Sequence, residues 1–142
     1  MSADDRWGFT PPDDSWVVEQ ELPTLRLFRL PDDLLVINPQ RGQVDDEQTA
    51  RVCRDALRAY AAALERPVRV AVLMDNTVNQ TAGARDVWSS ITPDWYGCCA
   101  LISNSILSRA MVSFFNGIRR PVVPTRVFAT LDEGLAWLRT QP

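Results

Sequence analysis

The first third of the chain carries three short apolar runs that are typical of strands. They are Trp16–Gln20, Leu25–Leu30 and Leu34–Ile37, and their β-branched residues, partial alternation or continuous apolar character favour strands over helices. Pro31-Asp32-Asp33, between the second and third runs, suits a type I turn. We therefore expect the second and third strands to form a hairpin, and the polar stretch 38–42 to end the third strand as a loop.

A helical period replaces this pattern from Asp45 to Glu65. Acidic residues fill the first turn, where carboxylates meet the positive end of the helix dipole. Pro67 ends the helix, because proline has no backbone N–H to donate. One face of the predicted helix is apolar and consists of Cys53, Leu57, Tyr60 and Leu64.

Apolar strands and helical stretches then alternate. Val68–Met74 is almost entirely apolar, which indicates a strand covered on both faces. We expect a polar loop at Asp75–Gln80, a short helix at Thr81–Ser90 and a second buried strand at Cys98–Ile102.

The last third predicts one short strand between two helices. Ser105 can cap the first of these helices, and Arg126–Ala129 reads as the strand. Thr130 and Glu133 have the capping-box spacing that opens the final helix. The apolar stripes of the two helices are Leu107, Met111, Phe114 and Ile118 in the first, and Leu131, Leu135 and Leu138 in the second.

This order of elements predicts an α/β fold: a single domain with a mixed β-sheet, in which an N-terminal hairpin precedes alternating helices and strands. Residues 1–15 are acidic and contain Pro11-Pro12, so we interpret them as a flexible acidic tail. Trp7 and Phe9 could still dock on the body. The domain itself is expected to span residues 16–142.

Composition narrows the range of functions. The chain has 46% apolar and 23% charged residues, typical of a soluble globular protein. A net charge of −3 argues against nucleic-acid binding as the main activity. Because histidine is absent, no Ser-His-Asp or Cys-His catalytic device and no histidine-ligated metal can form. We expect neither a catalytic site nor a metal or other cofactor.

The same composition bears on origin and location. All 15 basic residues are Arg, a bias typical of a GC-rich bacterial genome. No apolar run approaches the roughly 18 residues of a membrane span, so we expect no such span. Three cysteines and no export signal indicate a reduced, cytoplasmic protein. These cysteines are Cys53, Cys98 and Cys99.

A set of residues spread over the C-terminal two-thirds of the chain forms a pattern, of which the closing part, from Arg126 to Leu138, is the most recognisable. The residues are Val68–Asp75, Ala100-Leu101-Ile102, Arg109, Phe114-Phe115, Pro121, Pro124, Arg126, Phe128, Glu133 and Trp137-Leu138. This pattern resembles that of the STAS-like family of small bacterial proteins, which are related to anti-sigma factor antagonists and to the cytoplasmic domains of sulfate transporters. The resemblance implies a mixed sheet with helices packed on it, acting as a binding or switching module.

The resemblance also implies a candidate phosphorylation switch. In the anti-sigma factor antagonists a strand ends in Asp-Ser-Ser-Gly, and the second Ser, at a helix N-terminus, is phosphorylated. The matching stretch here has Asp75, then Asn76 in place of the first Ser, Thr77 at the phosphoacceptor position and Val78 in place of Gly. We take Thr77 and Thr81 as candidate phosphoacceptors. In the alternative interpretation they are loop and cap residues that satisfy local donors.

A candidate surface for a partner or ligand follows from the same region. Its polar part is Asp75, Asn76 and Asn79, and its aromatic part is Trp88, Trp95 and Tyr96. Such aromatic residues can instead roof the core.

The adjacent pair Cys98 and Cys99 should point to opposite faces of its strand. Two small core residues are then the favoured interpretation, and a redox pair or soft-metal site is the alternative.

The leading hypothesis is therefore a non-enzymatic bacterial regulatory or protein-interaction module of STAS-like fold. It would bind a protein partner, and Met111 with Phe114-Phe115 could serve a homodimer contact or a helix buried from two sides. The alternative is a small-molecule or lipid carrier or sensor that uses an apolar pocket.

Overall fold

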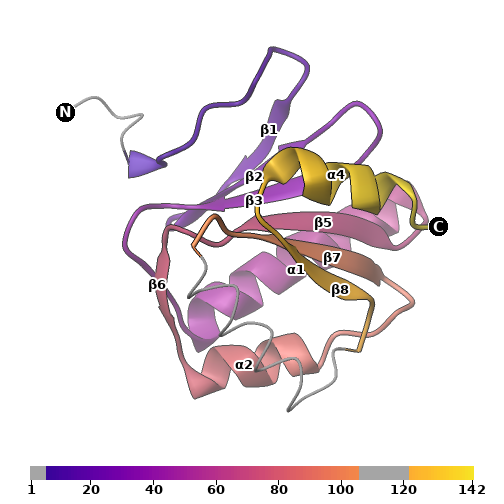
Figure 1. The fold of residues 1–142 in the computed structure, drawn as a ribbon. Coiled ribbons are helices and arrows are strands. Elements are labelled where there is room, and N and C mark those ends of the chain that lie inside the picture. Colours follow the sequence, from indigo (N-terminus) through magenta and orange to yellow (C-terminus); the bar gives the residue numbers. More distant parts are fainter. Residues whose placement is uncertain (1–5, 106–121) are drawn as a thin grey trace.

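The main sheet has six strands in the order β1-β2-β3-β5-β7-β8 (Figure 1). The computed structural model describes residues 6–105 and 122–142. The first two strand pairs are antiparallel and the remaining three are parallel, so the sheet is mixed, as predicted. The strands are β1 (Val17–Glu21), β2 (Leu25–Arg29), β3 (Leu35–Pro39), β5 (Val68–Leu73), β7 (Tyr96–Ile102) and β8 (Thr125–Phe128).

The predicted hairpin is confirmed as β2 and β3. The backbone N–H of Leu30 donates to the carbonyl of Leu34 at 2.9 Å, and that of Asp33 donates to the carbonyl of Leu30 at 2.9 Å. Asp33 closes the turn with φ at 63°, a left-handed conformation that Asp tolerates better than most residues. The register places Leu27 opposite Ile37.

Three helices lie in the described part of the chain, on both faces of the sheet (Figure 1). They are α1 (Glu47–Leu64), α2 (Ala82–Ser89) and α4 (Leu131–Arg139). Asp46 caps α1 by accepting from the N–H of Thr49 at 2.8 Å. Asp45 therefore lies outside the helix that the sequence predicted from that residue. The helix predicted from Ser105, with its stripe Leu107, Met111, Phe114 and Ile118, lies outside the described residues, as do Arg109 and Phe115.

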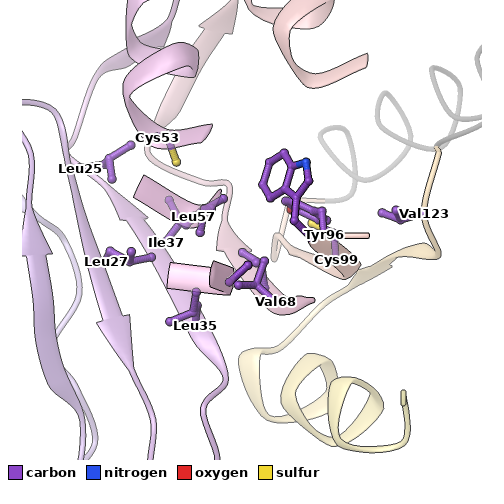
Figure 2. Close-up of a cluster of buried hydrophobic side chains, with 13 residues drawn as sticks. Leu25, Leu27, Leu35, Ile37, Cys53, Leu57, Val68, Tyr96, Cys99 and Val123 are labelled. Carbon is purple, nitrogen blue, oxygen red and sulfur yellow. The ribbon is translucent and has the colours of Figure 1, made fainter. Parts of the chain in front are cut away.

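Each face of the sheet has its own apolar cluster. On the face of α1, side chains of β2, β3, β5 and β7 pack against Cys53, Leu57 and Ala61 of that helix (Figure 2). On the opposite face, Leu135 and Leu138 of α4 pack against the alternate residues of the same strands. The sheet is thus buried on both sides, which explains why the pattern of β5 is almost continuously apolar.

The structure corrects one expected loop. Thr77–Gln80, predicted as part of a loop, forms strand β6, which pairs in parallel with the short strand β4 (Gln43–Asp45). We call this two-stranded sheet the ribbon. Both strands are short and mostly polar, so they lack the alternation that marks a strand. The pairing depends on contacts between segments 34 residues apart.

The described part of the expected tail, residues 6–15, touches the domain. Trp7 is buried, and Phe9 packs against the cluster on the α4 face, so the two side chains that could dock on the body do so. The interpretation of residues 1–15 as a flexible tail, with a boundary at residue 16, stays a prediction.

Candidate functional site

Polar side chains gather where the parallel strands end. Asn38 lies near the end of β3, Asp75 and Asn76 follow β5, and Ser103 follows β7. Ligands of open α/β sheets bind outside the carboxyl ends of the strands. In Figure 1, β6 lies at this end of the sheet. The candidate site predicted from Asp75 to Thr81 is therefore at the edge where such folds place their sites.

Asp75 connects the ends of β5 and β7. Its Oδ1 accepts from the hydroxyl of Ser103 at 2.6 Å, and its Oδ2 accepts from the backbone N–H of Asn104 at 3.3 Å. Ser103 is buried whereas Asp75 is exposed. The carboxylate therefore fixes the geometry of this edge while one side of it faces solvent.

Asn76 holds three segments together. Its Nδ2 donates to the carbonyl of Trp7 at 2.7 Å and to that of Pro39 at 3.0 Å. Its own carbonyl accepts from the backbone N–H of Gln43 at 3.1 Å. Asn76 thus joins the end of β3, the start of the ribbon and the N-terminal segment, and its side chain is only half-exposed.

Thr77 does not have the surroundings expected of a phosphate site. Its backbone N–H donates to the carbonyl of Met74 at 3.1 Å, and its hydroxyl donates to Oε1 of Gln43 at 3.1 Å. Thr77 thus lies in β6 and not at a helix N-terminus, and its own backbone N–H is already hydrogen-bonded.

Thr81 is the N-cap of α2. Its hydroxyl accepts from the N–H of Ala84 at 3.2 Å, and its backbone N–H donates to the carbonyl of Asp45 at 2.9 Å. These are the local hydrogen bonds expected of a cap residue, which was the alternative to a phosphorylation site at Thr81. Phosphorylation of Thr77 or Thr81 stays a prediction.

Each strand of the ribbon carries an exposed apolar side chain, and we call the solvent-exposed part of the ribbon its outer surface. Val44 on β4 is 43% exposed and Val78 on β6 is 68% exposed. Asn79, which the sequence placed in the candidate surface, pairs with Val44 across the ribbon and is also exposed. The candidate surface predicted from the sequence did not include these two valines, because single valines in polar stretches show no periodic pattern. The exposed large apolar side chains of the described residues are Val17, Val18, Val44, Val78 and Val122.

Asp45 anchors the ribbon to α2. Its Oδ2 accepts from Nε2 of Gln80 at 2.9 Å and from Nε1 of Trp88 at 3.1 Å. Burial raises the pKa of the Asp45 carboxyl, although these two hydrogen bonds act in the opposite direction. Trp88 is half-buried and lies next to the ribbon through this bond, so it belongs to the same region of the surface.

Trp95 and Tyr96 lie away from the ribbon. They are 8% and 4% exposed, their rings meet edge to face with centroids 5.6 Å apart, and both belong to the cluster on the α1 face (Figure 2). They stand at the amino end of β7, whereas Asp75 follows the carboxyl end of the parallel strand β5. Their packing is that of the core-roof alternative, and a binding role for them stays a prediction.

The cysteines are buried and their thiols are poor nucleophiles. Cys98 packs on the α4 face of β7 and Cys99 on the α1 face, as the alternation of a strand predicts. Burial raises the pKa of Cys98 to about 11 and that of Cys99 to about 12. Burial also raises the pKa of Cys53. All three act as small core residues in this structure.

Two surface hollows lie apart from the residues of Asp75–Thr81. One, of about 350 Å³, is bounded by the end of α1, Pro67 and Trp95. The other, of about 230 Å³, lies between the β1–β2 turn and the start of α1. The alternative of an apolar carrier pocket stays a prediction.

The described residues hold neither a metal-binding cluster nor a membrane-spanning helix. Across residues 6–105 and 122–142, no three His, Cys, Asp or Glu side chains are close enough together to hold a metal ion. Over the same ranges, no helix has the length and apolar character needed to cross a membrane.

Comparisons with known proteins agree with this architecture. A search of curated proteins found no match. A solved structure, described as an uncharacterized protein of the DUF3478 family with a SpoIIAA-like fold from Shewanella loihica PV-4, is similar with a TM-score of 0.60. The two chains share 14% identity, and the match covers 86% of this chain and 99% of the other. It confirms the STAS-like fold that the resemblance implied. Residues 28–141 match a family model described as Domain of unknown function (DUF7793), and the chain therefore belongs to this family.

Proposed function

We propose that this chain is a non-enzymatic, cytoplasmic bacterial regulatory module that binds a protein partner through the outer surface of the ribbon. The observation that carries the proposal is the exposure of Val44 and Val78 on neighbouring strands, beside the polar residue Asn79. Apolar side chains rimmed by polar ones are typical of interaction surfaces.

The ribbon presents these valines on a fixed support. Asn76 holds its start, and Asp45 links its end to Gln80 and Trp88. A preorganised surface loses less conformational entropy on binding than a mobile loop does. Burying what is still exposed of Val44 and Val78 is worth about 2 kcal/mol, which corresponds to about 30-fold in affinity.

Paired variants of the full chain test this surface. Val44→Ser with Val78→Ser alters the ribbon, and Val17→Ser with Val18→Ser alters β1, the edge strand of the main sheet, as a matched control. Tagged chains are recovered from bacterial cells after cross-linking, and bound proteins are quantified by mass spectrometry. We expect a partner that is lost at least tenfold from the ribbon variant and kept by the control.

Equal recovery from both variants, or no partner with any chain, would refute the proposal. Analytical ultracentrifugation of the purified chain shows whether the partner is a second copy. In that case the ribbon variant should be monomeric and the control should remain a dimer.

The proposal includes regulation at Thr77 or Thr81. A phosphate on Thr81 would bring negative charge to the segment that hydrogen-bonds Asp45 and would disturb the cap of α2. Intact-mass measurement of the chain purified from a bacterial host, repeated with Thr77→Val and Thr81→Val, tests this part. An added mass of one phosphate should disappear in one of the two variants.

A further inference from the structure

The segment Arg6–Phe9 lies across the ends of β3 and β5 and is held as a bound peptide would be. The carbonyl of Trp7 accepts from Nδ2 of Asn76 at 2.7 Å and from Nδ2 of Asn38 at 3.1 Å. The carbonyl of Arg6 accepts from the backbone N–H of Arg41 at 2.8 Å. Two side-chain amides and one main-chain amide thus bind the backbone of a segment that belongs to no strand of either sheet.

The Trp7 side chain is recognised as well. Trp7 is 5% exposed, and the guanidinium groups of Arg6 and Arg26 lie 4.5 and 4.7 Å from its ring centroid. Arg26 also donates to the carbonyl of Phe9 at 3.0 Å and to Oδ1 of Asn38 at 2.8 Å. Arg26 and Asn38 therefore act together: Arg26 contacts the Trp7 ring and the carbonyl of Phe9, and Asn38 donates to the carbonyl of Trp7 itself.

The backbone of the segment fits closely. Gly8 has φ at +60°, and a Cβ at this position would come within 2.9 Å of Nε of Arg41 and 3.1 Å of Nδ2 of Asn76. Gly adopts this left-handed conformation without strain, whereas a Cβ here would press on the side chains of Arg41 and Asn76. These contacts therefore favour a Trp followed by Gly.

Asn38 gives the strongest sign of a built site. Its side chain is fully buried at the end of β3, yet its amide is aimed at a segment from outside the sheet. A buried amide costs free energy unless it is hydrogen-bonded. Asn38 keeps its bonds to Pro39 and Arg26 without the segment, so the site can persist when the segment leaves.

We propose that Asn38, Asn76 and Arg26 form a binding site for an extended peptide that contains Trp-Gly, and that the chain's own Arg6–Phe9 occupies this site in cis. A partner segment of the same chemistry binds when the chain's segment leaves. Because a tethered segment has an effective concentration in the millimolar range, it keeps a free peptide out at ordinary concentrations. The proposal is independent of the valine surface of the ribbon.

A peptide-binding measurement on the full chain tests the inference. The probe is a fluorescent synthetic peptide of residues 6–12, and binding is followed by anisotropy. Trp7→Ala removes the indole from the tethered segment, so we expect this variant to bind the peptide at least tenfold more tightly than the unaltered chain does. Adding Asn76→Ala to that variant should abolish binding, and a peptide with Ala in place of Trp should not bind.

A second variant guards against a folding defect in Trp7→Ala. Gly8→Ala keeps the indole but strains the observed backbone next to Arg41, so it should also open the site to the peptide. Circular dichroism and urea unfolding confirm that each variant is folded. Equal affinity of the unaltered chain and both folded variants, or no binding by either variant, would overturn the proposal. Failure of the ribbon variants described above would leave it intact.

Discussion

Gly134 of α4 lies close against the sheet. A Cβ built on this residue would lie 2.3 Å from Cδ1 of Ile102, and its next neighbour is Cβ of Ala100 at 3.4 Å. Carbon atoms pack best about 3.5–4.0 Å apart. Gly134→Ala therefore forces Ile102, which is 7% exposed, or the helix itself to move.

Two effects of opposite sign decide how Gly134→Ala changes the free energy of unfolding. Overpacking a core costs about 1–3 kcal/mol, whereas Ala in place of Gly inside a helix gains about 1 kcal/mol. We expect Gly134→Ala to lower the free energy of unfolding by about 0–2 kcal/mol, the sum of these effects. Ile102→Val removes the clashing Cδ1 and by itself costs about 0.5–1.5 kcal/mol.

In the Ile102→Val background we expect the effect of Gly134→Ala on the free energy of unfolding to change sign. With Cδ1 gone, the next contact of the added Cβ, at 3.4 Å from Ala100, is ordinary. Gly134→Ala should then be neutral or stabilising by up to about 1 kcal/mol, through helix propensity alone. The coupling free energy between the two substitutions is therefore about 1–3 kcal/mol.

Urea unfolding of the four proteins, followed by tryptophan fluorescence, measures this cycle. Equal effects of Gly134→Ala in both backgrounds, within about 0.5 kcal/mol, would refute the packing argument. They would mean that α4 does not approach the sheet as closely at this position.

The remaining predictions concern titratable groups. Because burial raises the pKa of Cys98 and Cys99, a thiol reagent at pH 8 should label no cysteine of the folded chain rapidly and all three in urea; rapid labelling without denaturant would contradict their burial. Because burial raises the pKa of Asp45 above 3.8, the folded state holds a proton there that the unfolded chain loses, so stability falls as the pH rises from about 4 through the folded pKa. Asp45→Asn should remove this part of the pH dependence in urea unfolding, and an unchanged slope would show that the carboxyl is not desolvated.

Elements whose local signals agree with their final contacts were predictable from the sequence. The final helix is an example, because Thr130 accepts from the N–H of Glu133 as the capping-box spacing predicts, and Leu135 and Leu138 face the sheet. The hairpin is another, because its turn chemistry and its two apolar runs require the same register.

The ribbon was not predictable for the opposite reason. Neither β4 nor β6 has a local pattern that favours a strand, and Val44 and Val78 stand among polar neighbours. The hydrogen bonds that define the ribbon, such as that between Thr77 and Gln43, join distant parts of the chain. Pairing of this kind is a tertiary effect that overrides propensity.

The candidate site was predicted in part. The resemblance placed Asp75 and Asn76 at the end of a strand, and the structure has them there. Closeness in sequence led us to group Trp95 and Tyr96 with the same surface, but they lie at the other end of the sheet, because neighbours in sequence need not share an end of the sheet. The docking of Trp7 depends on Asn38 and Asn76, which are 31 and 69 residues away, and no local signal reports such a contact.

Asn76 connects the two proposed surfaces through separate atoms. Its side-chain amide binds the carbonyls of Trp7 and Pro39, whereas its main-chain carbonyl accepts from Gln43 at the start of the ribbon. Departure of the N-terminal segment therefore removes one bond from Asn76 and leaves those to Pro39 and Gln43. With these two bonds in place the ribbon keeps its anchor, so a change in occupancy at the Trp7 site need not disturb Val44 and Val78. Asn76→Ala removes the side-chain bonds to Trp7 and Pro39 but keeps the main-chain carbonyl that accepts from Gln43, and separate variants of Trp7 and of the valines test the two surfaces one at a time.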